Sequence, residues 1–341
     1  MTEINEGENW GDWFLAREGS RKTVQHKYYT KDKWEKVNNE NKLLLKEFLS
    51  SLKGLDRTEQ TILKYENALQ IFLIFLLEQS NNKFFIDIKK IDILRFQNWL
   101  LNEQKLSPAR IRLMKSAVSS WSNFIENYYS EEYKEFRNIV NKIEHPAKAA
   151  VREKTFLTQN QIDYLFDKLE KKQDWVKLAI LSLAISSGGR KAELFQVTKD
   201  CINNKIKDNL YKTNIVRGKG RGKGKFFYLV FGEETANYIR KYLEVRGQDD
   251  NELLFVFKDK TGEIKPYTAE HLTKWCYGSF SKILGIPVYA HCLRATRANL
   301  LIEANVPIEK IKSLLHHEST ETTSIYIKPR DEEDIEDIFS I

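Results

Sequence analysis

The stretch His291–Tyr326, HCLRATRANLLIEANVPIEKIKSLLHHESTETTSIY, contains the most informative residues of this chain. Its first part is apolar at helical spacing and places His291 and Arg294 three positions apart, on one face of the predicted helix. Asn305 stands where a left-handed helix cap is expected, and Pro307 is placed to open a second helix. The pattern therefore predicts two short helices joined by a tight turn.

The end of this stretch, LLHHESTETTSIY, places His317 nine residues before Tyr326. Imidazole and guanidinium groups near a phenol are suited to chemistry on a phosphodiester, because the cations stabilise charge at the phosphorus while the phenol attacks it. We therefore expect these side chains to converge in one site.

The composition is typical of a folded protein with room for two domains. Of its 341 residues, 41% are hydrophobic and 12% aromatic, which excludes a disordered chain. The net charge is +7, but the last eleven residues, DEEDIEDIFSI, hold six acids and no base, so residues 1–330 carry a net +13. Such a basic body indicates a polyanionic partner, with double-stranded DNA as the first candidate.

The cysteines and histidines do not indicate a metal site. Cys201, Cys276 and Cys292 have no ligand-like spacing and are typical of free thiols in a reducing compartment. The pair His316 and His317 lacks the H-E-x-x-H spacing, so we predict no metal and no other cofactor. The N-terminus lacks the features of a signal peptide, and no apolar run approaches about 18 residues. We therefore expect a cytoplasmic protein without a membrane span.

Changes in composition divide the chain into five segments. We expect a leader or DNA-binding arm at 1–40, a helical domain at 41–145, a linker at 146–156, a second domain at 157–330 and an acidic tail at 331–341. The linker is predicted because HPAKAAVREKTF combines proline, small residues and charge.

Four amphipathic helical patterns fill the segment 41–145. The first ends at Gly54, and the fourth begins with Ser107 as the N-cap and Pro108 at the first helical position. The apolar residues of the fourth pattern predict a core-facing stripe rather than a base-stacking surface; they are Met114, Val118, Trp121, Ile125 and Tyr128.

The segment 157–330 begins with a capping box from Thr158 to Gln161. The run WVKLAILSLAISSGGRKAELFQV then predicts a buried helix, a Gly-Gly turn and a second helix that carries Arg190 and Glu193. NLYKTNIV and KFFYLVF are β-rich runs separated by RGKGRGKG, which predicts a hairpin with a cationic tip. The expected fold is mainly α with one small β-sheet, an α+β domain.

Together these motifs resemble those of the tyrosine recombinases, the phage integrase family. SSGGRKAEL resembles the first arginine box of that family, with Arg190 and Glu193 in the matching positions. GKGRGKGKFFYLV resembles the hairpin that carries the family lysine, with Lys219 as the better match and Lys223 as the alternative. The remaining catalytic positions of the family match at His291, Arg294, His317 and Tyr326.

The resemblance implies a two-domain DNA clamp, with a SAM-like core-binding domain and a catalytic domain. It implies that Tyr326 forms a 3′-phosphotyrosyl bond, that the two arginines clamp the phosphate, and that the lysine protonates the leaving 5′ oxygen. The two histidines would donate further hydrogen bonds, and Glu193 would orient an arginine or a histidine.

The implied function is that of a site-specific recombinase, an integrase of a phage or other mobile element. It would act without metal or ATP through a Holliday junction in a tetramer on DNA. Accessory DNA-bending or directionality factors are further expected partners. The tail at 331–341 would dock on a neighbouring protomer, with packing on its own domain as the alternative.

Basic side chains in three places are the expected DNA phosphate contacts. On the early, polar side of the fourth helix, a merely solvated face is an equally good interpretation. The expected contacts are Arg110, Arg112 and Lys115 in that helix, Lys148, Arg152 and Lys154 in the linker, and Arg217, Arg221, Lys223 and Lys225 in the hairpin.

The chain departs from the family pattern at several positions. Gly189 replaces a larger apolar residue, and His316 replaces a glycine, so that two histidines compete for one role; the spacing to Tyr326 favours the second. Ala295 stands where a histidine is common and Arg297 where an aromatic residue is common. Two other functions therefore stay open: a DNA-binding repressor or architectural protein of the same fold that does not cut DNA, and a type IB topoisomerase.

Overall fold

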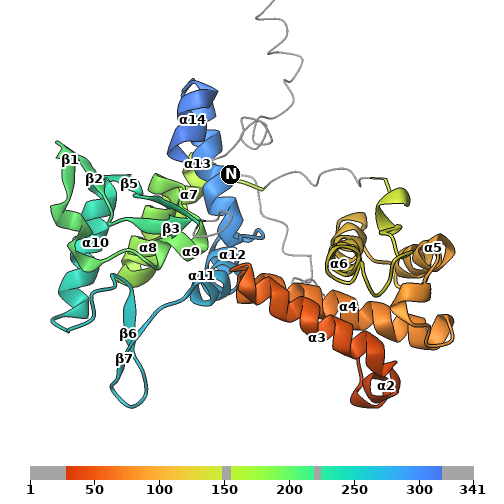
Figure 1. The fold of residues 1–341 in the computed structure, drawn as a ribbon. Helices are drawn as coiled ribbons and strands as arrows, with labels where there is room; N and C mark the ends of the chain where they lie inside the picture. The colour runs from red at the N-terminus through yellow and green to blue at the C-terminus, as the bar shows by residue number, and fades with distance from the viewer. Residues whose placement is uncertain (1–27, 148–154, 219–223, 317–341) are drawn as a thin grey trace, which may run out of the picture. The chain divides into compact units, whose positions relative to one another are not determined.

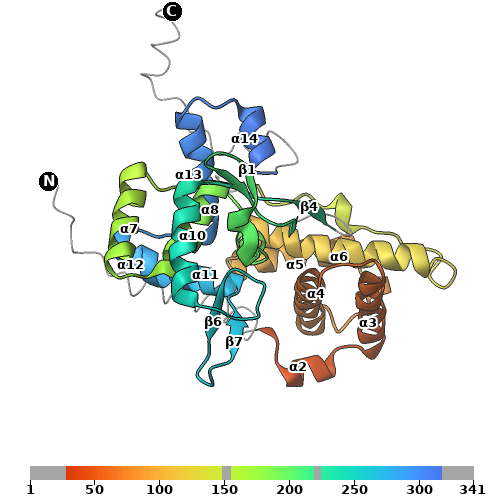
Figure 2. The same cartoon turned by 90° about the vertical axis from the view of Figure 1, so that its left-hand side faces the viewer.

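The structure, a computed structural model, describes residues 28–147, 155–218 and 224–316. The chain divides into two compact units, Met1–Val151 and Arg152–Ile341, each with its own hydrophobic core (Figures 1 and 2). The predicted linker at 146–156 contains this division, although its central part lies outside the described residues.

The N-terminal unit is built from helices. Three long helices form most of its core, and shorter helical segments connect and flank them. The segments are α2 (Lys31–Lys36), α3 (Asn39–Gly54), α4 (Glu59–Gln79), η1 (Phe85–Asp87), α5 (Lys90–Asn98), η2 (Trp99–Glu103), α6 (Pro108–Tyr128) and η3 (Val140–Lys142).

The capping and burial of α6 follow the sequence pattern. The Ser107 side chain accepts a hydrogen bond from the backbone N–H of Arg110, and Pro108 occupies the first turn. Trp121 is fully buried, and its indole N–H donates to the backbone carbonyl of Leu44 on α3. The predicted core stripe is confirmed except at Tyr128, which is 72% exposed because it lies in the last turn, beyond the packed part of the helix.

The C-terminal unit combines helices with short strands. Its helical segments are α7 (Gln159–Lys171), α8 (Trp175–Ser187), α9 (Lys191–Leu194), η4 (Lys199–Asn203), α10 (Glu233–Arg246), α11 (Ala269–Trp275), η5 (Cys276–Phe280), α12 (Ser281–Leu284), α13 (Ala290–Glu303) and α14 (Ile308–Leu314).

Helix α8 lies at the centre of this unit, as its apolar sequence predicts. It packs against α10 and α13, and a hydroxyl pair at 2.7 Å joins Ser182 of α8 to Thr235 of α10. The predicted capping box at the start of α7 is confirmed, because Thr158 and Gln161 exchange side-chain to backbone hydrogen bonds. This packing places the end of α8 beside α13 (Figure 2).

The strands form three separate antiparallel sheets in the described part of the chain, where one sheet was expected. Each strand has only three residues, too few to show a clear alternation of apolar and polar side chains. The sheets are β1 (Lys205–Lys207), β2 (Leu210–Lys212) and β5 (Val230–Gly232) in the order β1-β2-β5; β3 (Val216–Gly218) with β4 (Lys225–Phe227); and β6 (Val256–Lys258) with β7 (Ile264–Pro266).

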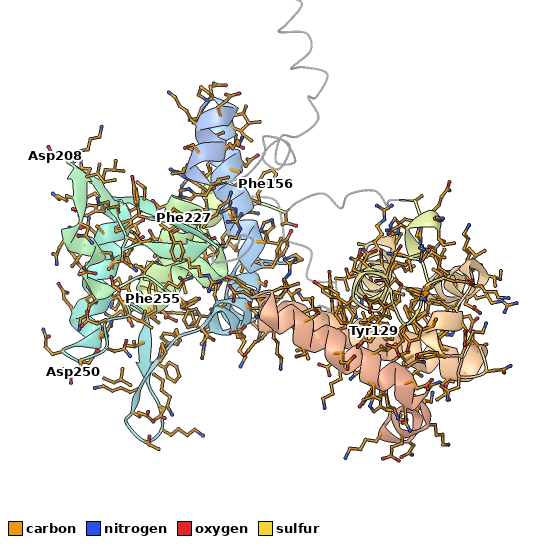
Figure 3. The ribbon with its side chains drawn as sticks, in the orientation of Figure 1. Tyr129, Phe156, Asp208, Phe227, Asp250 and Phe255 are labelled. Atoms are coloured by element: carbon orange, nitrogen blue, oxygen red, sulfur yellow. The ribbon has the colours of Figure 1, made fainter. Side chains whose placement is uncertain are left out.

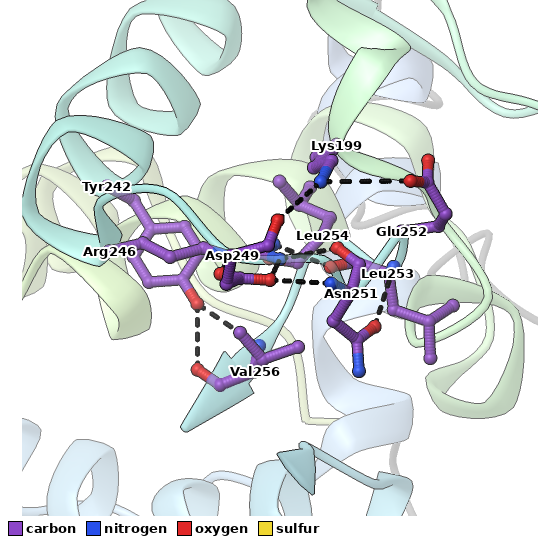
Figure 4. A network of polar contacts seen from close by, with 9 residues as sticks. All are labelled: Lys199, Tyr242, Arg246, Asp249, Asn251, Glu252, Leu253, Leu254 and Val256. Carbon is purple, nitrogen blue, oxygen red and sulfur yellow. Dashed lines mark hydrogen bonds and ion pairs between the residues drawn. The ribbon is translucent and has the colours of Figure 1, made fainter. Parts of the chain in front are cut away.

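A buried ion pair holds the segment that precedes β6 to the end of α10 (Figure 4). The Arg246 guanidinium binds the Asp249 carboxylate at 2.6 and 2.5 Å and donates to three backbone carbonyls between residues 251 and 254. The Tyr242 hydroxyl donates to the backbone carbonyl of Val256 at 2.9 Å.

Among the residues that the structure describes, no helix is both long and apolar enough to cross a bilayer.

Candidate functional site

The turn after α8 forms the floor of the candidate site. Gly188 caps α8 in the left-handed conformation, with φ of +64°. A Cβ at this position would lie 2.4 Å from Leu315 Cδ2, so a larger residue does not fit. Gly189 is also closely packed, because a Cβ there would lie 2.9 Å from Leu194 Cδ2 and 3.0 Å from Leu229 Cδ1. The neighbouring leucines therefore occupy the space of the larger residue that is usual at this position.

Arg190 follows this turn and is held by Glu193. The carboxylate of Glu193 accepts from the backbone N–H of Arg190 at 2.7 Å and from its Nη1 at 2.9 Å. Glu193 is only 2% exposed, whereas the Arg190 side chain is about one-third exposed. The carboxylate therefore fixes the orientation of a cation that can still reach a ligand.

Arg294 is buried in α13, one helical turn after the exposed His291. Its Nη1 donates to the backbone carbonyl of Gly188 at 2.6 Å, and its Nη2 donates to that of Leu315. These carbonyls lie at the C-terminal ends of α8 and α14, where helix carbonyls lack intrahelical partners. Arg294 thus joins the ends of two helices, and one of its two bonds is to Gly188, two residues before Arg190.

His316 lies in the electrostatic field of the same groups. Burial lowers the pKa of His316, the backbone carbonyl of Tyr228 and the carboxylate of Glu193 partly oppose this shift, and the charges of Arg294 and Arg190 add to it. Arg190 and Glu193 of the first arginine box, Arg294 of the H-x-x-R motif and His316 therefore lie close together, although they are far apart in sequence.

A surface hollow of about 650 Å³ adjoins this cluster. It lies between the end of β4 and α14 and has both basic and aromatic lining. The lining residues are Lys225, Phe226, Phe227, Glu309, Lys312, Ser313 and His316.

Comparison with known proteins decides the family. A sequence profile of the Phage integrase family matches residues 155–333, more than half of the chain. The SPbeta prophage-derived recombinase-like protein YomM of Bacillus subtilis (strain 168) is 31% identical over 318 residues, which cover 91% of this chain and 94% of that protein. This chain belongs to the phage integrase family.

Two further comparisons agree with this integrase-family assignment. Tyrosine recombinase XerC of Caldanaerobacter subterraneus subsp. tengcongensis is 29% identical over 309 residues, covering 83% of this chain and 82% of that protein. The solved structure of the Tn1549 transposon integrase in complex with transposon right-end DNA has a TM-score of 0.64 at 13% identity, covering 87% of this chain and 98% of that one. At such low identity the likeness shows the fold alone, and it confirms the predicted tyrosine-recombinase fold.

The described ranges include four of the expected integrase-family catalytic or supporting residues: Arg190, Glu193, His291 and Arg294. No cluster of three or more His, Cys, Asp or Glu side chains that could hold a metal ion occurs in these ranges. Eight further expected site residues lie outside the described residues; they are Lys219, Lys223, Arg221, His317 and Tyr326, and the linker residues Lys148, Arg152 and Lys154.

Lys115 is not on the surface of this integrase-family protein, so the expectation of a phosphate contact there is wrong. The side chain is 1% exposed, and its Nζ donates to Gln97 Oε1 at 2.7 Å and to the backbone carbonyls of Ile143 and Glu144 at 2.9 and 3.0 Å. Burial, and then the charge of Arg112, lower its pKa. The amine therefore ties the end of the N-terminal unit to α6.

The other two basic residues expected on α6 differ from Lys115 in their surroundings. Arg112 is half-buried, and its Nη2 donates to the backbone carbonyl of Pro146 at 2.7 Å, just before the predicted linker. Arg110 is half-buried in the first turn of the helix, and burial lowers its pKa.

Two residues near the candidate site were not identified as site residues from the sequence. Phe227 gave no signal, because only the strand register shows which of the two adjacent phenylalanines faces inward. Arg297 was noted only as a departure from the family. Its Cγ would lie 3.4 Å from a Cβ at Gly188, and its buried Nε has no hydrogen-bond partner among the described residues.

Proposed function

We propose that this chain is a site-specific recombinase that cuts and rejoins double-stranded DNA through a 3′-phosphotyrosyl intermediate. The observation that carries the proposal is the convergence of Arg190, Glu193 and Arg294 at the turn after α8, in a chain of the phage integrase family. The relative XerC is named a tyrosine recombinase, and the Tn1549 integrase structure contains DNA.

In the proposed reaction the hydroxyl oxygen of Tyr326 attacks the phosphorus and gives its proton to His291, and the bond from phosphorus to the 5′ oxygen breaks. Lys219 or Lys223 gives a proton to that oxygen. The new phosphotyrosyl ester conserves the energy of the phosphodiester, so that a second 5′ hydroxyl restores the DNA backbone without ATP.

The arrangement of the cations supports this reaction. Glu193 orients Arg190 before any ligand binds, so little reorganisation is needed when charge develops on the phosphate. A free phenol has a pKa of about 10, so its attack at neutral pH requires a cationic environment or a base. Arg190, Arg294, His291 and His317 are the groups that we propose for this role.

On DNA we propose a tetramer that exchanges strands in two steps through a Holliday junction. Phosphate contacts would come from Arg110 and Arg112, from the linker residues Lys148, Arg152 and Lys154, and from the hairpin residues Arg217, Arg221, Lys223 and Lys225. The acidic tail at 331–341 would dock on a neighbouring protomer. The prophage origin of YomM and the transposon origin of the Tn1549 integrase support a role in the integration of a phage or other mobile element. The protein would act in the cytoplasm, together with accessory DNA-bending or directionality factors.

Covalent trapping tests the proposal. The purified full chain is incubated with nicked duplexes taken from the DNA that flanks its gene, and protein–DNA adducts are separated under denaturing conditions. We expect an adduct with the wild type and none with Tyr326→Phe. Tyr164→Phe is the matched control, because Tyr164 is an exposed tyrosine of α7 in the same unit, and its adduct should equal that of the wild type.

Three other outcomes would contradict the proposal. Specific retention of a duplex by wild-type protein without an adduct would indicate the non-cutting repressor or architectural protein. Relaxation of supercoiled plasmid without any preferred site would indicate a topoisomerase. An adduct that persists in Tyr326→Phe would show that another residue is the nucleophile.

A further inference from the structure

His316 has a backbone conformation that suits glycine better than histidine. Its φ is +52°, in the left-handed region, immediately after the C-terminal end of α14. A side chain in this conformation requires contacts that offset the strain. The contacts of the His316 ring therefore indicate which part of the protein this residue holds in position.

The His316 ring is held by strand β4 and the residue that follows it. It stacks on Phe227 with ring centroids 3.8 Å apart and planes inclined by 23°. The imidazole also lies in one hollow with Phe227 and Tyr228, and the backbone carbonyl of Tyr228 acts to raise its pKa. One face of the ring is thus occupied by the hairpin, which favours a structural use of this imidazole over a contact with phosphate.

Phe227 connects this stack to the catalytic cluster. A Cβ at Gly218, on the paired strand β3, would lie 2.4 Å from Phe227 Cε1 and 3.2 Å from Glu193 Oε1. The ring of Phe227, labelled in Figure 3, therefore lies directly against the glycine at the base of the hairpin tip. The layer from Glu193 through Gly218 and Phe227 to His316 is continuous.

We propose that His316 is a positioning residue that holds the β3–β4 hairpin against the end of α14, so that the lysine at the hairpin tip reaches the leaving oxygen. The inference rests on the proposed recombinase function. It holds whether that lysine is Lys219 or Lys223, because both stand between Gly218 and Gly224 in the sequence.

The test uses two leaving groups in the covalent trapping reaction. An ordinary nicked duplex releases a 5′ alkoxide, which needs a proton from the lysine. A duplex with a 5′-bridging sulfur releases a thiolate, which leaves without that proton because a thiol has a pKa of about 8.5. A misplaced lysine therefore slows only the first reaction.

The variants are His316→Gly, which relieves the backbone strain, His316→Asn, which tolerates it, and Phe227→Leu, which removes the stacking partner. At saturating DNA, we expect each to form the ordinary adduct about tenfold to a hundredfold more slowly, a part of what a general acid contributes. We expect wild-type rates on the sulfur duplex, unchanged DNA affinity, and a His316→Gly, Phe227→Leu double variant no slower than either single variant.

Tyr164→Leu is the matched control, because Tyr164 is an exposed ring of α7 that does not stack on His316; its rates should equal those of the wild type. Of Lys219→Ala and Lys223→Ala, the variant whose slow rate is restored on the sulfur duplex identifies the lysine that gives the proton.

Wild-type rates in His316→Gly would overturn the inference while leaving the recombinase function intact. Equal slowing on both duplexes, or unfolding of all three variants, would show that His316 is a packing residue. A wild-type chain that binds its site without forming an adduct would overturn the recombinase function, and the inference with it.

Discussion

Arg294 donates a hydrogen bond of 2.6 Å to the backbone carbonyl of Gly188, which lies 106 residues earlier in the sequence. The same guanidinium donates to the backbone carbonyl of Leu315. A charged side chain that is only 2% exposed thus joins the ends of α8 and α14. In this protein the residue proposed to clamp the phosphate also assembles the site around it.

We expect Arg294→Ala to lower the free energy of unfolding by roughly 2–6 kcal/mol, because it leaves two buried carbonyls without donors at roughly 1–3 kcal/mol each. It should also abolish the covalent adduct. Urea unfolding measures the first effect. Arg240→Ala is the control, since Arg240 pairs with Glu233 at the surface and its loss should cost less than about 1 kcal/mol. Equal stability of the two variants would contradict the structural role of Arg294.

We expect Glu193→Gln to slow adduct formation about tenfold to a hundredfold, because a hydrogen bond between charged groups contributes roughly 1.5–3 kcal/mol. The amide can still accept from the backbone N–H of Arg190, so the fold should be retained. Single-turnover adduct formation is the measurement. Glu170→Gln is the matched control, because Glu170 pairs with Lys241 at the surface. Unchanged kinetics in Glu193→Gln would show that Arg190 does not need this partner.

We expect Gly218→Ala to slow adduct formation, because the added methyl group would lie 2.4 Å from the Phe227 ring and force the hairpin to shift. The rate at saturating DNA, compared with DNA affinity, is the measurement. Gly278→Ala in the same unit is the control, because nothing lies within 4 Å of its added Cβ. A normal rate in Gly218→Ala would indicate that the hairpin position is not critical.

Asp249 should make stability depend on pH in the acid range. Its hydrogen bonds from Arg246 lower the pKa of Asp249 to about 2. Because the folded-state pKa is below the unfolded-state value of about 3.9, the stabilisation of roughly 2 kcal/mol is fully present above that value. It is lost as the pH falls through about 2.

The difference in unfolding free energy between wild type and Asp249→Asn, measured in urea at several pH values, should therefore shrink below about pH 4. Asp208→Asn, at the exposed turn between β1 and β2, is the control and should show no such change. A difference that stays constant down to about pH 2 would contradict the assignment.

We expect Lys115→Met to lower the free energy of unfolding by roughly 1–3 kcal/mol, because buried oxygen acceptors lose their donor. The slope of log affinity against log salt should not change, because a buried amine releases no counterion. Arg110→Gln, at a proposed phosphate contact, should lower that slope by about one. A reduced slope in Lys115→Met would show that the amine reaches DNA after all.

The local structure followed closely from the sequence. Ser107 and Thr158 are caps, Asn305 has the left-handed conformation that was expected before Pro307, and α8 is buried as its apolar composition predicts. Caps and helix periodicity depend on residues within one or two turns of each other, so one sequence contains the necessary information. The order of the family motifs was equally visible and led to the family that the comparisons show.

The surroundings of individual side chains could not be predicted in this way. Nothing local distinguishes Lys115, which is buried among carbonyls, from the neighbouring cations of α6. The number of sheets was wrong for a related reason, because a three-residue strand is defined by its partner rather than by its own pattern.

By itself the sequence determined the helices, their caps and the family, and it predicted the set of catalytic residue types. Only the tertiary structure decided which of these side chains meet. It paired Arg190 with Glu193, gave Arg294 the carbonyls at two helix ends, and stacked His316 on Phe227. The physical reason is that hydrogen bonds and ring contacts depend on distances of a few ångströms between segments that are far apart in the chain, and only the packed core sets those distances.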